Sequence, residues 1–183
     1  MTLPIFTVGH STRTPEEFLA LLRMYGVTCL ADVRTAPRSR RVPQFNRETL
    51  PAALATQQIA YRHLPGLGGF RRPRPDSPNL GLKHKGFRGY ADYMLTEPFE
   101  AALRELLTLS RDHRVAAMCA EAVPWRCHRS LLADALTARG VAVEHILSAT
   151  QRWPHQLTTW ACRHGEGLVY PAPSTGQEEF WPR

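Results

Sequence analysis

Two absences set the first limits on what this chain of 183 residues can be. No apolar run approaches the length of about eighteen residues that a membrane-spanning helix needs. The first residues lack both the basic segment and the long apolar stretch of a secretory signal peptide. We therefore expect a cytoplasmic protein with no membrane partner.

Lysine is almost missing, because Lys83 and Lys85 are the only two in the chain. The formal net charge of +7 therefore comes from arginine, whose planar guanidinium is well suited to binding phosphate. A genomic preference for arginine would explain the ratio of arginine to lysine, but it would not explain the excess of positive charge. The excess predicts an anionic small molecule or a nucleic acid as the partner.

Cysteine is scarce as well, and the four in the chain are Cys29, Cys119, Cys127 and Cys162. In a cytoplasmic protein we expect reduced thiols rather than a disulfide framework, so their roles are catalytic, metal-binding or structural. Their spacing is not that of a zinc knuckle or ribbon, in which paired ligands lie about two to four residues apart. We accordingly predict no metal site, and the favoured function requires no cofactor.

Short apolar runs alternate with amphipathic segments along the chain. Strands are expected over residues 5–8, 27–33, 59–64, 115–120 and 141–147. Helices are expected from Thr14 to Gly26, over 46–58, from Tyr90 past Glu97-Pro98, and over 127–139. This alternation predicts a three-layer α/β/α, Rossmann-like domain over residues 1–147, with about five mainly parallel strands in the order 3-2-1-4-5.

Two segments show neither the periodicity of a helix nor that of a strand. Residues 65–89 are rich in glycine, proline and basic side chains, and a structureless loop of that length is normally functional or disordered. Residues 148–183 are rich in tryptophan, histidine and proline. We expect them to form an irregular tail that packs on the same domain.

Polar and titratable side chains follow nearly every predicted strand. In chain order they are His10 and Ser11, Asp32 and Arg34, Tyr61 and His63, and Cys119 and Glu121. Because the carboxyl ends of parallel strands meet at one edge of the sheet, where ligands usually bind, we expect the functional site at that edge.

The richest of these segments runs from Cys119 to Arg129 and joins the fourth predicted strand to the helix after it. No conventional capping residue precedes Cys127, so the first amides of that helix are expected to be free to bind an anion beside Arg126 and Arg129. In the alternative, Glu121 reaches across and caps the helix itself.

The favoured hypothesis is an enzyme that acts on a nucleotide or nucleic acid by acid–base hydrolysis or glycosyl transfer. Glu121 and Asp32 would be the acid and base, and His10 would carry the proton because its side chain titrates near neutrality. The predicted ligand-binding residues are Ser11, Arg34, Arg40, Arg126 and Arg129.

Two other functions stay open. One is a thiol- or metal-dependent enzyme that uses Cys119, Cys127 and His128, since a thiol beside arginine and histidine ionises readily. Within that set Cys119 lies in an apolar strand and is expected to be structural. The other is a non-catalytic nucleic-acid-binding module, favoured by loops in which basic residues alternate with aromatic ones.

Several of these motifs occur together in one known family. They are Val8-Gly9-His10-Ser11-Thr12-Arg13, Asp32-Val33-Arg34 with Pro37-x-Ser39-Arg40, Pro43-Gln44-Phe45, Leu67-Gly68-Gly69, and Cys119-Ala-Glu121 followed by Cys127-His128-Arg129. From the first strand to about Ile146 the chain resembles the bacterial domain-of-unknown-function family 488. The resemblance implies an α/β domain of uncharacterised biochemistry with these segments, including the two cysteines, as signature positions. It does not imply a reaction.

Overall fold

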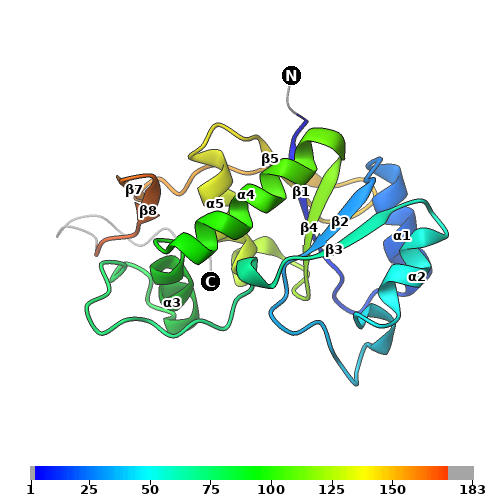
Figure 1. Ribbon diagram of the computed structural model, residues 1–183, viewed down its shortest axis with the longest axis horizontal. Helices are drawn as coiled ribbons and strands as arrows, with labels where there is room; N and C mark the ends of the chain where they lie inside the picture. Colours follow the sequence, from blue (N-terminus) through cyan, green and yellow to red (C-terminus); the bar gives the residue numbers. More distant parts are fainter. Residues whose placement is uncertain (1–2, 173–183) are drawn as a thin grey trace.

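The fold is built around a six-stranded sheet in the order β3-β2-β4-β1-β5-β6. It is seen in a computed structural model that describes residues 3–172 (Figure 1). The strands are β1 (Ile5–Gly9), β2 (Cys29–Asp32), β3 (Ala60–His63), β4 (Val115–Cys119), β5 (Val143–Ile146) and β6 (Arg152–Pro154). The first five are parallel to their neighbours, and β6 runs antiparallel to β5.

Helices cover both faces of the sheet, so the predicted three-layer α/β/α class is confirmed (Figure 1). On one face lie α1 (Pro15–Met24) and α2 (Leu50–Ala55), and on the other lie α3 (Lys85–Tyr93), α4 (Glu97–Asp112) and α5 (Arg129–Thr137). Side chains of a strand alternate between its two faces. In β4, accordingly, Met118 packs in the core with α1, while Ala117 packs in the core with α4 and α5.

The predicted strand order was right in one respect and wrong in another. Strand β1 pairs with β4, as expected. However, β2 pairs with β4 rather than β1, and β5 pairs with β1 rather than β4, so the places of strands 1 and 4 are exchanged. The crossover through α1 sets β2 two places from β1, and the later strand β4 pairs with both of them. By contrast, the crossover through α2 leaves β2 and β3 as direct neighbours.

Of the predicted helix starts, that of α1 is confirmed and two others lie further along the chain. In α1, Thr14 and Glu17 form a capping box. The expected helix 46–58 is shortened to α2, with turns over residues 47–49 and 56–58 on either side of it. The helix expected from Cys127 begins at Arg129 instead, because residues 124–126 form another 3₁₀ turn, η3 (Pro124–Arg126), that leads into it.

The segment after Leu147 is more regular than the sequence predicts. Besides β6, it contains the hairpin β7 (Cys162–His164) and β8 (Gly167–Val169). Buried Asp134 on α5 anchors it by accepting hydrogen bonds from His155, the backbone and side chain of Thr158, and Tyr170, at 2.7–2.9 Å. Residues 173–183 of the predicted tail lie outside the described part.

The long basic loop is also ordered by specific contacts rather than structureless. Buried Asp92 on α3 accepts hydrogen bonds from the Arg74 backbone, the Ser77 hydroxyl and the Asn79 amide at 2.6–2.8 Å. The helix that was expected from Tyr90 already starts at Lys85. Among the described residues, no helix is both long and apolar enough to cross a bilayer.

Candidate functional site

The carboxyl ends of β1 and β4 are joined by backbone hydrogen bonds that continue past the strands. The His10 amide donates to the Cys119 carbonyl at 3.0 Å, and the Ser11 amide donates to the Ala120 carbonyl at 2.9 Å. The turn after β4 passes directly over Gly9, where a β-carbon would lie 1.7 Å from the Glu121 carbonyl oxygen. Only glycine fits there, and it brings the first and fourth strand ends together as predicted.

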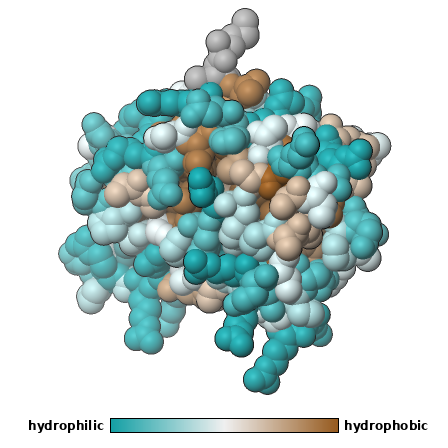
Figure 2. All heavy atoms as spheres, turned by 45° about the vertical axis from the view of Figure 1, so that its right-hand side comes forward, coloured by the Kyte–Doolittle hydropathy of each residue, from teal (hydrophilic) through white to brown (hydrophobic). Residues whose placement is uncertain are grey.

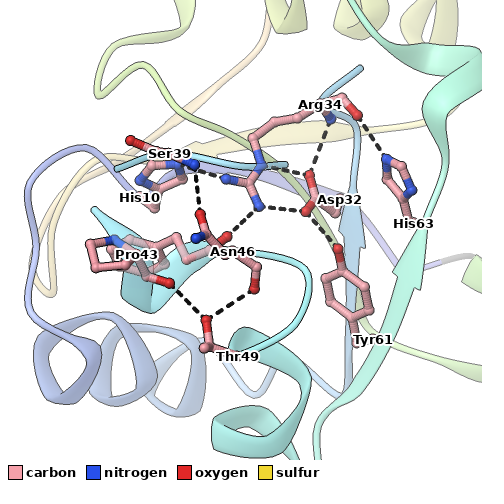
Figure 3. A network of polar contacts seen from close by, with 10 residues as sticks. His10, Asp32, Arg34, Ser39, Pro43, Asn46, Thr49, Tyr61 and His63 are labelled. Atoms are coloured by element: carbon pink, nitrogen blue, oxygen red, sulfur yellow. Dashed lines mark hydrogen bonds and ion pairs between the residues drawn. The ribbon is translucent and has the colours of Figure 1, made fainter. Parts of the chain in front are cut away.

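Beside this turn, Asp32 and Arg34 form a buried ion pair (Figure 3). Nε and Nη2 of Arg34 donate to the two carboxylate oxygens of Asp32 at 2.8 and 2.6 Å. The Tyr61 hydroxyl donates to the same carboxylate at 2.7 Å, and Nη2 of Arg34 also reaches the Phe45 carbonyl at 2.7 Å. The Asp32 carboxylate is fully buried, and these donors occupy both of its oxygens.

His10 is buried against the same pair and stacks on the Phe45 ring, with 4.3 Å between the ring centroids. Its Nδ1 is 2.9 Å from the Ser11 carbonyl, which can only accept, so Nδ1 carries the proton. Nε2 is then left as an acceptor for Nη1 of Arg34 at 3.2 Å. Burial and the neighbouring Arg34 lower the pKa of His10 to about 4, so the ring is neutral at pH 7.

A second cluster lies next to the first and consists of Cys119, Cys127 and His128. Their sulfur atoms and a ring nitrogen all lie within 4.8 Å of one another, and Sγ of Cys127 is 3.6 Å from Nδ1 of His128. Nε2 of His128 donates to the Val33 carbonyl at 3.1 Å. Val33 lies between Asp32 and Arg34 in the chain. That bond fixes the ring with Nδ1 turned toward the sulfur atoms, and it connects the two clusters.

The environment of Cys127 favours its thiolate form. The Cys119 thiol, the His128 ring and the buried Arg129 guanidinium lower the pKa of Cys127 well below its usual value. Arg129 contributes through Nε, which donates to Sγ of Cys127 at 3.4 Å. The same interaction with Cys127, together with burial, raises the pKa of Cys119. The two thiols are thus chemically unequal, and Cys119 is a partner of Cys127 and not only a packing residue.

The other wall of this cluster comes from the glycine-rich start of the basic loop, which the sequence indicated only weakly. A β-carbon on Gly69 would lie 2.9 Å from Nδ1 of His128, and one on Gly68 would lie 2.4 Å from the Thr35 hydroxyl. The Tyr90 ring packs against His128 with 4.9 Å between centroids. Of these neighbours of His128, only the Gly68-Gly69 pair could have been identified from the sequence, because glycine allows a close approach of the backbone.

The remaining predicted residues lie around the two clusters. The side chains of Glu121, Arg40 and Arg126 are exposed, while Ser11 is half-buried and adopts a left-handed backbone conformation with φ of 50°. Arg129 turns inward and donates to the Glu121 carbonyl as well as to Cys127. No side chain caps α5, so the alternative in which Glu121 caps this helix does not occur.

A family model described as a domain of unknown function, DUF488, matches residues 14–136 of the chain. The chain belongs to the DUF488 family. The matched range includes the motifs that follow β2 and β4, and the Gly9-His10-Ser11 motif lies just before its first residue. No curated protein and no solved structure matches the chain. What this DUF488 protein does must therefore be inferred from its own side chains.

Proposed function

We propose that this DUF488 protein is a thiol-dependent enzyme that acts on a phosphate-bearing ligand, with Cys127 as its nucleophile. The supporting observation is the convergence of three groups on one sulfur atom: the Cys119 thiol, Nδ1 of His128 and Nε of Arg129. A thiolate held in this way is the form of cysteine that attacks an electrophile. Its position at the carboxyl edge of the sheet is where open α/β folds bind ligands.

The chemistry follows from these positions. Nδ1 of His128, 3.6 Å from the sulfur, takes the proton of the Cys127 thiol, and the resulting thiolate displaces a leaving group from the ligand. The proton on Nδ1 then passes to that leaving group. Water or a second acceptor then releases the covalent intermediate. The exposed Glu121 carboxylate follows Cys119 by two residues and would serve as the base for that water. Hydrolysis or group transfer is the result.

Asp32 and His10 have a different role here from the acid–base roles that the sequence suggested. Asp32 is occupied by Arg34 and Tyr61, and the acceptor nitrogen of His10 is occupied by Arg34. We assign them to positioning: they hold the β2 end, including the Val33 carbonyl that orients His128.

Exposed arginines near the edge provide a site for phosphate. Arg38, Arg40 and Arg41 lie in the loop after β2, and none of them forms an ion pair within residues 3–172. In Figure 1 this loop lies below the sheet, and Figure 2 shows that the face of the molecule drawn there is mostly hydrophilic. Unpaired guanidiniums of this kind bind phosphate in two-point fashion.

The first test measures the ionisation of Cys127. In a Cys162→Ser background, which removes the exposed thiol, alkylation by iodoacetamide is followed by mass spectrometry from pH 5 to 10. We expect Cys127 to react with a midpoint well below the ordinary thiol value of about 8.5, and Cys119 to react far more slowly. Arg129→Met should move the midpoint upward. A Cys127 midpoint at or above 8.5 would overturn the proposal.

The second test measures turnover on a set of nucleotide, phosphomonoester and phosphodiester substrates. Cys127→Ser should abolish any turnover that the wild-type protein shows, and Cys162→Ser is the matched control that should leave it unchanged. Trapping of a ligand-derived adduct on Cys127 would support the covalent route. Full turnover by Cys127→Ser would exclude it.

One distance favours a second function, a metal-dependent hydrolase that uses the same three side chains. In a tetrahedral zinc site, sulfur at about 2.3 Å and nitrogen at about 2.0 Å lie roughly 3.6 Å apart, and Sγ of Cys127 and Nδ1 of His128 are 3.6 Å apart. The bond from His128 to a backbone carbonyl is also typical of a metal-binding histidine. One equivalent of metal in protein purified without added metal, lost in Cys119→Ser, would favour this function over the thiolate mechanism.

A further inference from the structure

Phe70 is the most exposed large apolar side chain among the described residues, with 94% of its surface accessible. It is also one of three described non-glycine residues with positive φ, here 58°, a conformation that bulky side chains rarely adopt. Neither property helps folding. A residue that is both exposed and strained points to a role in binding.

The backbone on both sides of Phe70 is held firmly. Before it, the Thr35 hydroxyl donates to the Gly69 carbonyl at 2.8 Å, and Gly69 lies against His128. After it, Nε of Arg71 donates to the Gly68 carbonyl at 3.2 Å, and its guanidinium stacks 3.7 Å over the Tyr93 ring. Phe70 is therefore presented to solvent from a fixed backbone beside the Cys127 and His128 centre.

The charge around Phe70 indicates what the ring contacts. Thr35, which bonds to Gly69, begins the loop that carries the exposed Arg38, Arg40 and Arg41, and exposed Arg72 follows Phe70 by two residues. Exposed aromatic rings combined with arginines are typical of proteins that bind single-stranded nucleic acids: bases stack on the rings and the arginines bind the phosphates.

We propose that Phe70 is the stacking platform for a nucleobase, so that the phosphate-bearing ligand is a nucleotide or a nucleotide within a single strand. The inference rests on the proposed function only for the position of the reacting group, because stacking does not require Cys127 to react. Phe70 then sets the kind of ligand that the thiol centre receives.

Binding is tested at low salt with two probes, AMP by calorimetry and a fluorescein-labelled oligothymidylate by anisotropy. Phe70→Ala should weaken binding roughly five- to hundred-fold, the range for loss of one stacked base, and Phe70→Trp should retain it. Leu80→Ala is the matched control, since Leu80 is 57% exposed in the same long loop and should not matter. A loss for both probes identifies a mononucleotide site, and a loss for the oligonucleotide alone identifies a strand-binding site.

Phe70→Gly separates binding from folding. Glycine accepts positive φ without strain, so this variant should unfold at a urea concentration no lower than wild type while it loses affinity for the probes. A lower midpoint would assign the ring to folding and overturn the inference, as would wild-type affinity in Phe70→Ala. Cys127→Ser should bind both probes normally, so a failure of the thiol mechanism and a failure of the stacking platform give different results.

Discussion

At the scale of single residues, the buried charges determine what each side chain can do. Arg34 is the residue on which the first cluster depends, because it bonds to the Asp32 carboxylate, the Phe45 carbonyl and Nε2 of His10. A buried ion pair adds little stability over an apolar pair of the same shape, but breaking it leaves an uncompensated charge. Removing either Asp32 or Arg34 alone should therefore destabilise the carboxyl edge of the sheet.

Arg34→Met should lower the free energy of unfolding by about 3–5 kcal/mol, because it leaves the buried Asp32 carboxylate unpaired. Tyr61→Phe removes one hydrogen bond from the same carboxylate and should cost about 1 kcal/mol. Urea unfolding monitored by circular dichroism measures both. Adding Asp32→Asn to Arg34→Met should recover part of the loss, and no recovery would contradict the assignment of the penalty to the unpaired charge.

At the scale of elements, the turn after β4 connects strand packing to the thiol centre. It passes over Gly9 at the end of β1, and the Glu121 carbonyl in that turn accepts a hydrogen bond from Arg129 at the start of α5. Another contact ties β6 to the same region, since Trp153 stacks on Trp125 of η3 with 5.5 Å between ring centroids. Three elements thus fix the position of the segment that ends in Cys127.

Gly9→Ala should be strongly destabilising, by about 3 kcal/mol or more, since its β-carbon would meet a backbone oxygen that can move only with the whole turn. The shift would disturb the Arg129 contact, so alkylation of Cys127 at pH 7 should slow as well. Urea unfolding and the alkylation rate are the two measurements.

Gly140→Ala is the control for Gly9→Ala. Nothing lies within 4 Å of a β-carbon there, and φ is 77°, so it should cost only about 1 kcal/mol for the left-handed backbone. The thiol should react normally in this variant. Equal costs for the two substitutions would refute the steric account of Gly9.

At the scale of the whole molecule, two buried neutral histidines make the fold sensitive to acid. Burial lowers the pKa of His10 to about 4 and that of His145 to about 3. His145 is held between the Thr7 hydroxyl at 2.7 Å and Nδ1 of His155 at 2.9 Å. In the unfolded chain both titrate near 6.5, so below that pH the unfolded state binds protons that the folded state does not.

The contribution of these two histidines to the free energy of unfolding should therefore be constant above about pH 6.5 and fall as the pH drops from 6.5 toward 4. The contribution of His10 is of the order of 3 kcal/mol. His10→Gln keeps an acceptor for Arg34 and removes the titration, so its stability should fall less steeply over this interval. Thermal melts across the pH range test it, with the exposed neighbour Thr12→Ala as control. Identical pH slopes in wild type and His10→Gln would count against the effect.

Much of the architecture was predictable because it depends on local sequence. Apolar runs gave the five main strands, Thr14 and Glu17 gave the start of α1, and the alternation of elements gave the parallel sheet. Since parallel strands share a carboxyl edge, the sequence also indicated which side chains would gather there. Cys127 could be singled out because the arginine and histidine next to it in the sequence also favour its thiolate.

Tertiary structure decided the contacts between residues far apart in the chain. The order of β1 and β4 depends on pairing between strands that are far apart in the chain, and no local propensity records that. Pairing with Arg34 occupies the Asp32 carboxylate, and for this reason we propose a positioning role for it in place of the predicted catalytic one. Packing brought Cys119 beside Cys127 and set Gly69 next to His128. The sequence by itself determined which chemical groups reach the edge of the sheet, and folding determined which of them are held by buried partners and which stay exposed.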